Sequence, residues 1–68
     1  MAQGDIETFH MATAWHNRVE GEGSIFFSHP EREIAVSEGQ KTAQERQVDH
    51  ILRNPDGTIA QKRSYRSA

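Results

Sequence analysis

A chain of 68 residues is long enough for one small domain, and a domain of this size buries only about 60% of the surface that its unfolded chain exposes. Apolar residues make up 34% of the sequence, which provides one thin core with no room for a buried cofactor. The absence of cysteine excludes a disulfide. We therefore expect self-association to supply the extra stability that a small domain needs. The net charge of −2 is ordinary and is not the charge of a strongly basic nucleic-acid-binding domain.

The first half of the chain predicts three short strands. Residues 6–11 and 14–19 have extended character, and Phe9 and Met11 fall on one face of the first of them. Residues 20–23 form a flexible acidic connection, and residues 24–27 are a third extended stretch.

The only good helix candidate follows, from about residue 30 to residue 45. Ser28 and Glu31 have the spacing of a capping box, and Pro30 would lie in the first turn, where its missing N–H costs little. Ala35, Gly39 and Ala43 recur every four residues and therefore share one face. This stripe of small residues predicts that the helix backbone approaches the sheet closely.

The clearest local signal is the sequence Asn54-Pro55-Asp56-Gly57. Proline suits the second position of a type I turn, and glycine accepts the left-handed conformation at its end. The flanking segments 48–53 and 58–63 are extended, so this region predicts a β-hairpin. The complete order is β-β-β-α-β-β, which predicts an α+β domain: a small antiparallel sheet of four or five strands with one helix packed on one face.

These features resemble a bacterial family, the domain of unknown function numbered 2188. The resemblance is carried by Trp15, by the Ala35-Gly39-Ala43 stripe, by the strand 48–53 with Asp56-Gly57 and Ile59, and by Ser64-Tyr65. It is best from residue 35 to residue 65. The sequence departs from the family pattern in its acidic segment 19–23 and in having Arg66 after the tyrosine, where glycine is usual. The resemblance implies the same fold but no activity, so it assigns no catalytic or binding residue.

No residue pattern indicates catalysis. The serines lie in no nucleophile-elbow or triad pattern, and the helix glutamates are best interpreted as a solvated face. His10 and His16 could face each other across the first hairpin, with His50 joining from another strand, but the spacings of a zinc site are absent. We expect surface or rim histidines, no metal and no enzyme.

The charges are divided unevenly along the chain. Residues 1–45 carry three basic and eight acidic side chains, a net charge of −5, whereas residues 46–68 carry five basic and two acidic ones, a net charge of +3. Such asymmetry is typical of a nucleic-acid-binding surface or of a surface that meets an acidic partner. The simpler interpretation is that the two halves lie side by side and neutralise each other.

No apolar run approaches the roughly 20 residues needed to cross a bilayer, and residues 1–5 lack the pattern of a signal peptide. With the absence of cysteine, this favours a cytoplasmic protein with no membrane partner. We expect a flexible tail over residues 1–5 and a single domain over residues 6–66.

Two functions remain open from the sequence. The first is a non-enzymatic protein-interaction or self-associating module. In it, the sheet face opposite the helix presents Trp15 or one of the adjacent Phe26 and Phe27, with Phe26 as the candidate interface residue beside Trp15. For Trp15 a core anchor is the simpler interpretation. The alternative is weak nucleic-acid binding through the basic C-terminal hairpin, by phosphate contacts and base stacking on Tyr65. The cations of that surface would be Arg46, Arg53, Lys62, Arg63 and Arg66.

Overall fold

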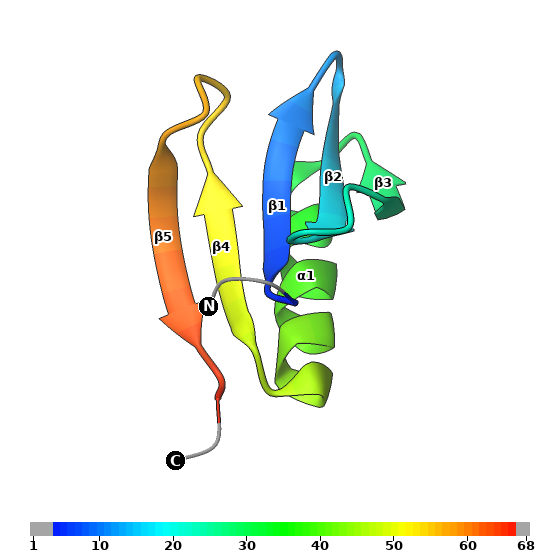
Figure 1. The fold of residues 1–68 in the computed structure, drawn as a ribbon. Helices are drawn as coiled ribbons and strands as arrows, with labels where there is room; N and C mark the ends of the chain where they lie inside the picture. The colour runs from blue at the N-terminus through cyan, green and yellow to red at the C-terminus, as the bar shows by residue number, and fades with distance from the viewer. Residues whose placement is uncertain (1–3, 67–68) are drawn as a thin grey trace.

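The computed structural model describes residues 4–66, which form a sheet with one helix on one face (Figure 1). The elements follow the predicted order β-β-β-α-β-β, so the α+β class is confirmed. Their bounds are β1 Ile6–Met11, β2 Ala14–Val19, β3 Ile25–His29, α1 Arg32–Arg46, β4 Asp49–Arg53 and β5 Ile59–Ser64.

The five strands lie in the order β3-β2-β1-β4-β5, and the sheet is mixed, not wholly antiparallel as we expected. The strands β1, β2 and β3 form an antiparallel meander, and α1 then carries the chain back across the sheet. Because the helix returns the chain to the end where β1 begins, β4 runs in the same direction as β1 and pairs with it in parallel.

The small-residue stripe of α1 lies against the sheet as the sequence predicts. Ala35, Gly39 and Ala43 are the buried residues of the helix. A Cβ atom built on Gly39 would lie 2.6 Å from Thr8 Oγ1 and 2.8 Å from both Asn17 Oδ1 and His50 Nε2. The helix backbone therefore contacts side chains of β1, β2 and β4 with no space left for a methyl group.

The helix begins differently from the prediction, because the capping box at Ser28 does not form. The residue before the first turn is Glu31, whose side chain makes no capping hydrogen bond. The hydroxyl of Ser28 is instead bonded to His16, and the backbone N–H of Glu31 donates to Nδ1 of His29 at 3.0 Å. The strand β3 extends to His29, so Ser28 belongs to the sheet and cannot also cap the helix.

The predicted hairpin between β4 and β5 is confirmed. The N–H of Gly57 donates to the carbonyl of Asn54 at 2.8 Å, and Gly57 has a φ of +94°, in the region that favours glycine. The carboxylate of Asp56 accepts hydrogen bonds from the N–H and the hydroxyl of Thr58, at 2.9 and 2.7 Å. The turn thus fixes the register of the last two strands.

The apolar core lies at the end of the sheet where β1 begins, and it contains Ile6, Val19 and Ala43, with Val48 and Tyr65 packed against them.

The position of Asp5 beside this end of the sheet corrects the predicted start of the domain. We assigned residues 1–5 to a flexible tail, but the N–H of Gly4 donates to the carbonyl of Glu20, and Asp5 is buried and accepts a hydrogen bond from the N–H of Asp49. The fold therefore includes both residues, while residues 1–3 lie outside the described part.

The strand β5 lies outside the part of the sheet that the helix covers. The helix α1 packs against β1, β2, β3 and β4, and all six residues of β5 are exposed. Between residues 4 and 66, no helix is long and apolar enough to span a membrane.

Replacing Gly39 by alanine tests the close contact. We expect Gly39→Ala to lower the free energy of unfolding by about 1–3 kcal/mol, because the added methyl group displaces Thr8, Asn17 or His50. This expected change is the net one, after the gain of about 1 kcal/mol that alanine brings to an open helix position. The measurement is urea denaturation followed by circular dichroism, with Ser37→Ala on the exposed side of the helix as the control. A Gly39→Ala protein as stable as the control would contradict the close approach.

Candidate functional site

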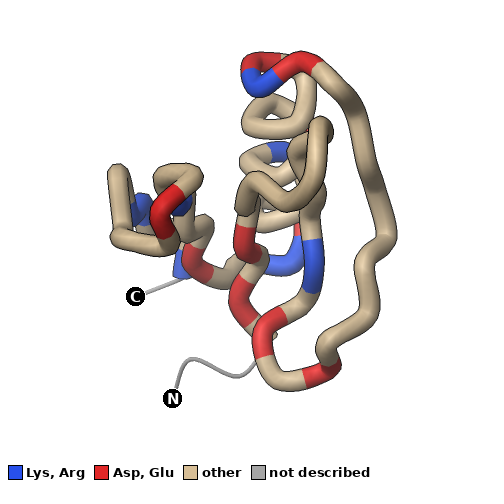
Figure 2. The backbone as a smooth tube through the Cα atoms, turned by 90° about the horizontal axis from the view of Figure 1, so that it is seen from above, with Lys and Arg blue, Asp and Glu red and all other residues tan. Residues whose placement is uncertain are grey.

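The five cations expected to form one nucleic-acid surface do not gather on one side of the fold. Viewed from above, basic and acidic positions are interspersed (Figure 2). Arg46 lies in the last turn of α1. Arg63 pairs in register with His50, whose side chain faces the helix, so Arg63 points to the helix side of the sheet. The other three cations lie on the opposite side.

That opposite side is the open face, the surface of the sheet that α1 does not cover. Thr8, Asn17 and His50 lie against Gly39, and successive residues of a strand point to opposite sides. Their neighbours in each strand therefore belong to the open face. The registers of β3 with β2 and of β5 with β4 extend the same alternation to the two edge strands. In chain order, the open face includes Glu7, Phe9, Met11, His16, Arg18, Phe26, Ser28, Asp49, Ile51, Arg53, Lys62 and Ser64.

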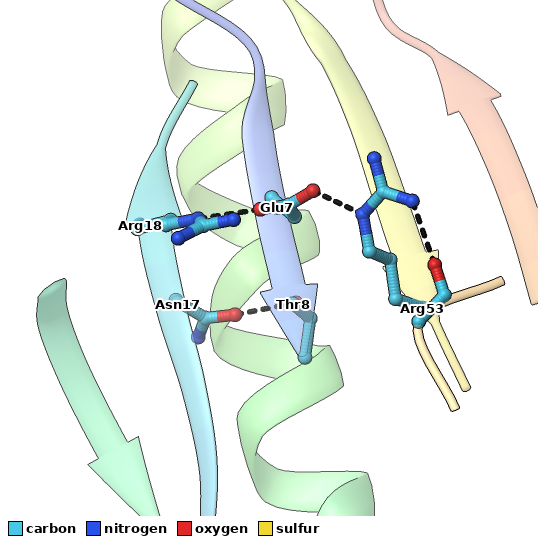
Figure 3. A network of polar contacts seen from close by, with 6 residues as sticks. Glu7, Thr8, Asn17, Arg18 and Arg53 are labelled. Carbon is cyan, nitrogen blue, oxygen red and sulfur yellow. Dashed lines mark hydrogen bonds and ion pairs between the residues drawn. The ribbon is translucent and has the colours of Figure 1, made fainter. Parts of the chain in front are cut away.

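The open face is crossed by an ion-pair triad that joins three adjacent strands (Figure 3). Glu7 of β1 accepts hydrogen bonds from Nε of Arg18 on β2 and from Nε of Arg53 on β4. Arg53 also donates through Nη1 to the carbonyl of Gly57 at 2.9 Å. Burial raises the pKa of Glu7, but the hydrogen bonds and charges of Arg53 and Arg18 outweigh it and hold that pKa below its ordinary value. Glu7 is therefore ionised at neutral pH.

A second group of charges lies next to the triad at the start of β4. Asp5 is bonded to Arg66, and the carboxylate of Asp49 lies 3.3 Å from Nε of Arg66 and 3.7 Å from Nζ of Lys62. A hydrogen bond from Ser64 lowers the pKa of Asp49; burial opposes it, and Arg66 and Lys62 lower it further. Arg53, Lys62 and Arg66, three of the expected nucleic-acid cations, are thus engaged with carboxylates of this face.

The two members of these ion pairs differ in exposure. The side chains of Glu7 and Asp5 are 1% exposed and that of Asp49 is 12% exposed, whereas the side chains of the four cations are 30–56% exposed. The carboxylates lie below the surface and the cations lie above them. A molecule that approaches the open face therefore meets guanidinium and ammonium groups first.

Aromatic side chains are divided between the two sides of the sheet. On the open face, the guanidinium of Arg18 lies over the ring of Phe9, 4.4 Å from its centroid, and Phe26 is 43% exposed. Trp15, which we considered for the same face, lies on the helix side, where it meets His10 edge-on and lies 5.8 Å below the guanidinium of Arg32. Of the two expected interface residues, only Phe26 is on the uncovered side.

His16 and Ser28 form a hydrogen-bonded pair on the open face. Nε2 of His16 lies 3.1 Å from the carbonyl oxygen of Met11, which can only accept, so this nitrogen carries the proton. Nδ1 is then an acceptor, and the Ser28 hydroxyl donates to it at 2.6 Å. Two hollows in the described structure are lined by residues 18–23 and 31–34, and neither includes His16 or Ser28. The pair is best described as a cross-strand contact.

His50 lies in a network of polar side chains beneath the helix, not at the surface where we expected the histidines. The Thr8 hydroxyl donates to Oδ1 of Asn17, and Nδ2 of Asn17 donates to the carbonyl of Ala35 at 2.9 Å. Since the one hydroxyl proton of Thr8 is used, Nε2 of His50 must donate to Thr8 Oγ1 at 2.7 Å. Burial, and then the charge of Arg63, lower the pKa of His50 below 6.5, so the ring is neutral.

Sequence reasoning missed Glu7 and Arg18 as members of the site. A signal for this pair was present, because strands 6–11 and 14–19 joined by a two-residue turn place Glu7 directly opposite Arg18. No comparable signal identified Arg53, since its contact with Glu7 depends on β4 lying beside β1. Within residues 4–66, no group of three His, Cys, Asp or Glu side chains could hold a metal ion.

The triad predicts a pH-dependent stability contribution. We expect Glu7→Gln to lower the free energy of unfolding by about 2 kcal/mol at neutral pH, since two part-exposed guanidinium groups lose their shared carboxylate. Because the pKa of Glu7 is lowered in the folded state, this contribution is complete above pH 4.5 and is lost as the pH falls through the folded pKa. Urea denaturation from pH 7 downward measures it, with the exposed loop change Glu22→Gln as the control. If the difference in free energy of unfolding between the wild type and Glu7→Gln does not change with pH, the charge-based explanation is contradicted.

His50 predicts a second, separate pH dependence. The unfolded protein takes up a proton near pH 6.5, whereas the folded protein resists protonation of the buried ring. The free energy of unfolding is therefore highest above pH 6.5 and falls as the pH decreases below it. In His50→Gln, which keeps an N–H donor for Thr8, this fall should disappear between pH 6.5 and about 5. An NMR titration of the His50 ring with a midpoint at or above 6.5 would refute the interpretation.

Comparison with known proteins gives the family but no function. The model of a family described as uncharacterized proteins conserved in bacteria, domain of unknown function 2188, matches residues 6–65. No curated protein and no solved structure matches the chain. The match covers all five strands and the helix, which confirms the resemblance stated from Trp15, the small-residue stripe and the Asp-Gly turn. The chain is a member of this uncharacterized bacterial family.

Proposed function

We propose that this protein is a non-enzymatic interaction module that pairs with a second copy of itself through the edge of β3. One observation carries the proposal: β3 is an exposed edge strand without a single charged side chain. An edge strand offers backbone N–H and C=O groups to another strand, and natural sheets usually protect such an edge with charge, proline or a covering segment.

The side chains of β3 suit pairing with another strand. Its sequence, Ile-Phe-Phe-Ser-His, is rich in residues that favour strands, and Ile25 and Phe26 are 42% and 43% exposed. Burying Ile25 against a second copy adds apolar contact in a domain whose own core is thin. This is the kind of added support that a 68-residue chain without disulfides needs.

The opposite edge of the sheet is protected from the same pairing. The strand β5 carries Lys62 and Arg63 side by side, and two copies of β5 brought together would place like charges near one another. Two copies of β3 meet no such repulsion. An antiparallel arrangement about a two-fold axis brings the same strand of each copy together and closes the assembly at two chains.

Nucleic-acid binding through the C-terminal hairpin as one surface gains no support from the arrangement of its cations. Arg53, Lys62 and Arg66 lie on the open face, while Arg63 points to the helix side and Arg46 belongs to the helix, so the five cations do not form one surface.

The two edges provide a matched pair of variants. We expect size-exclusion chromatography with light scattering to give twice the chain mass of 7.7 kDa at high concentration, falling to one chain on dilution. Ile25→Lys on β3 should weaken self-association at least tenfold, whereas Ile59→Lys, the same change at a 54% exposed isoleucine of β5, should not.

Two results would contradict the proposal. The first is a single chain mass at every concentration. The second is an equal loss of association in Ile25→Lys and Ile59→Lys, because a general effect of added charge would then replace pairing at β3.

A further inference from the structure

The open face presents cations in a row across the sheet. Arg18 lies on β2 and Arg53 on β4, with Glu7 between them (Figure 3), and Lys62 lies on β5. The side chain of Glu7 is 1% exposed. Asp49, the carboxylate beside Lys62, is also largely buried. The exposed charge of this surface is therefore positive, although the whole chain carries −2.

The two arginines of this row are held in place before any ligand arrives. Each uses its Nε to bind Glu7, which leaves the planar ends of both guanidinium groups fixed at the surface. Arg18 is fixed a second time by the ring of Phe9, and Arg53 by the carbonyl of Gly57. A pre-organised guanidinium loses less conformational freedom on binding than a mobile one, and its fork of N–H donors matches a phosphate group.

Apolar and aromatic groups flank the cations on the same side of the sheet. Phe26 and Met11 are 43% and 51% exposed, and Phe9 lies next to Arg18. Proteins that bind single strands of nucleic acid combine cations that contact the phosphates with aromatic rings on which bases stack. An inorganic or acidic-peptide ligand would use the cations but not the rings.

The remaining acidic side chains do not obstruct this surface. Glu33, Glu38 and Glu45 lie on α1 and Glu31 directly precedes it, and this helix covers the opposite side of the sheet. Glu20 and Glu22 lie in the turn between β2 and β3, and Asp56 lies in the turn between β4 and β5, where it accepts hydrogen bonds from Thr58. A polyanion can therefore approach the open face without meeting an exposed carboxylate among its strands.

From these observations, we propose that the open face binds single-stranded nucleic acid, with Arg18, Arg53 and Lys62 contacting phosphates and with Phe26 as a stacking surface for a base. Of the five cations expected from sequence, the proposal keeps Arg53 and Lys62, and it adds Arg18. The cations of the proposal, Arg18, Arg53 and Lys62, lie on β2, β4 and β5, so their contacts with phosphate do not require self-association through β3.

The test is an NMR titration of the ¹⁵N-labelled protein with a short oligodeoxythymidylate at about 50 mM and about 200 mM salt. Shifts should cluster on the strands that carry the proposed contacts, β2, β3, β4 and β5, and weaken steeply with salt. Arg18→Gln should weaken binding about fivefold to tenfold and reduce the slope of log K against log salt by about 0.7. Arg32→Gln is the matched control, because it removes a guanidinium that lies over Trp15 on the helix side. It should change neither the affinity nor the salt slope.

If Arg18→Gln unfolds, Lys62→Gln replaces it, because Lys62 is 56% exposed and takes no part in the contact with Glu7. A phenylalanine change, Phe26→Ala, should reduce affinity without changing the salt slope, since stacking releases no counterions.

Three results would overturn the proposal. One is a flat titration at low salt, and another is equal weakening by Arg18→Gln and Arg32→Gln. The third is a polyglutamate peptide or inorganic phosphate that binds as tightly as the oligonucleotide, because the bases would then contribute nothing.

Discussion

The contact between Gly39 and the side chains of Thr8, Asn17 and His50 sets the distance between the helix and the sheet, and the rest of the fold follows from that distance. With no side chain on the helix at this point, the space below it is filled by the polar groups of three strands. Each of these groups is hydrogen-bonded, which a buried polar atom requires. Asn17 extends the network to the Ala35 carbonyl, so β1, β2, β4 and α1 are held in one register.

The other side of the sheet solves a different problem, because no second layer covers it. There the charged side chains provide the cover. The stems of Arg18 and Arg53 lie beside Glu7, so that a carboxylate in the central strand is buried on a face that has no helix. The two sides thus stabilise their buried polar groups by different means: a neutral hydrogen-bond network under the helix, and ion pairs with their cations outward on the open face.

The sequence was informative wherever a structure depends on neighbouring residues. The Asn-Pro-Asp-Gly turn, the four-residue spacing of Ala35, Gly39 and Ala43, and the alternation in β1 all concern local geometry, and these predictions were right. The capping box was wrong because Ser28 has a competing partner, His16, that is 12 residues away. The parallel pairing of β1 with β4 and the position of Arg53 depend on the path of the chain across the sheet, which no local pattern encodes.

The strand β1 comes first in the chain but lies in the middle of the sheet, and this has a consequence for the order of folding. Its pairing with β2 closes a two-residue turn, whereas its pairing with β4 joins residues such as Ile6 and His50 that are separated by the whole of β2, β3 and α1. Contacts between distant residues must first overcome the entropy of closing a long loop. We therefore expect both hairpins to form early and the seam between β1 and β4 to close last, joining two locally folded halves into one sheet.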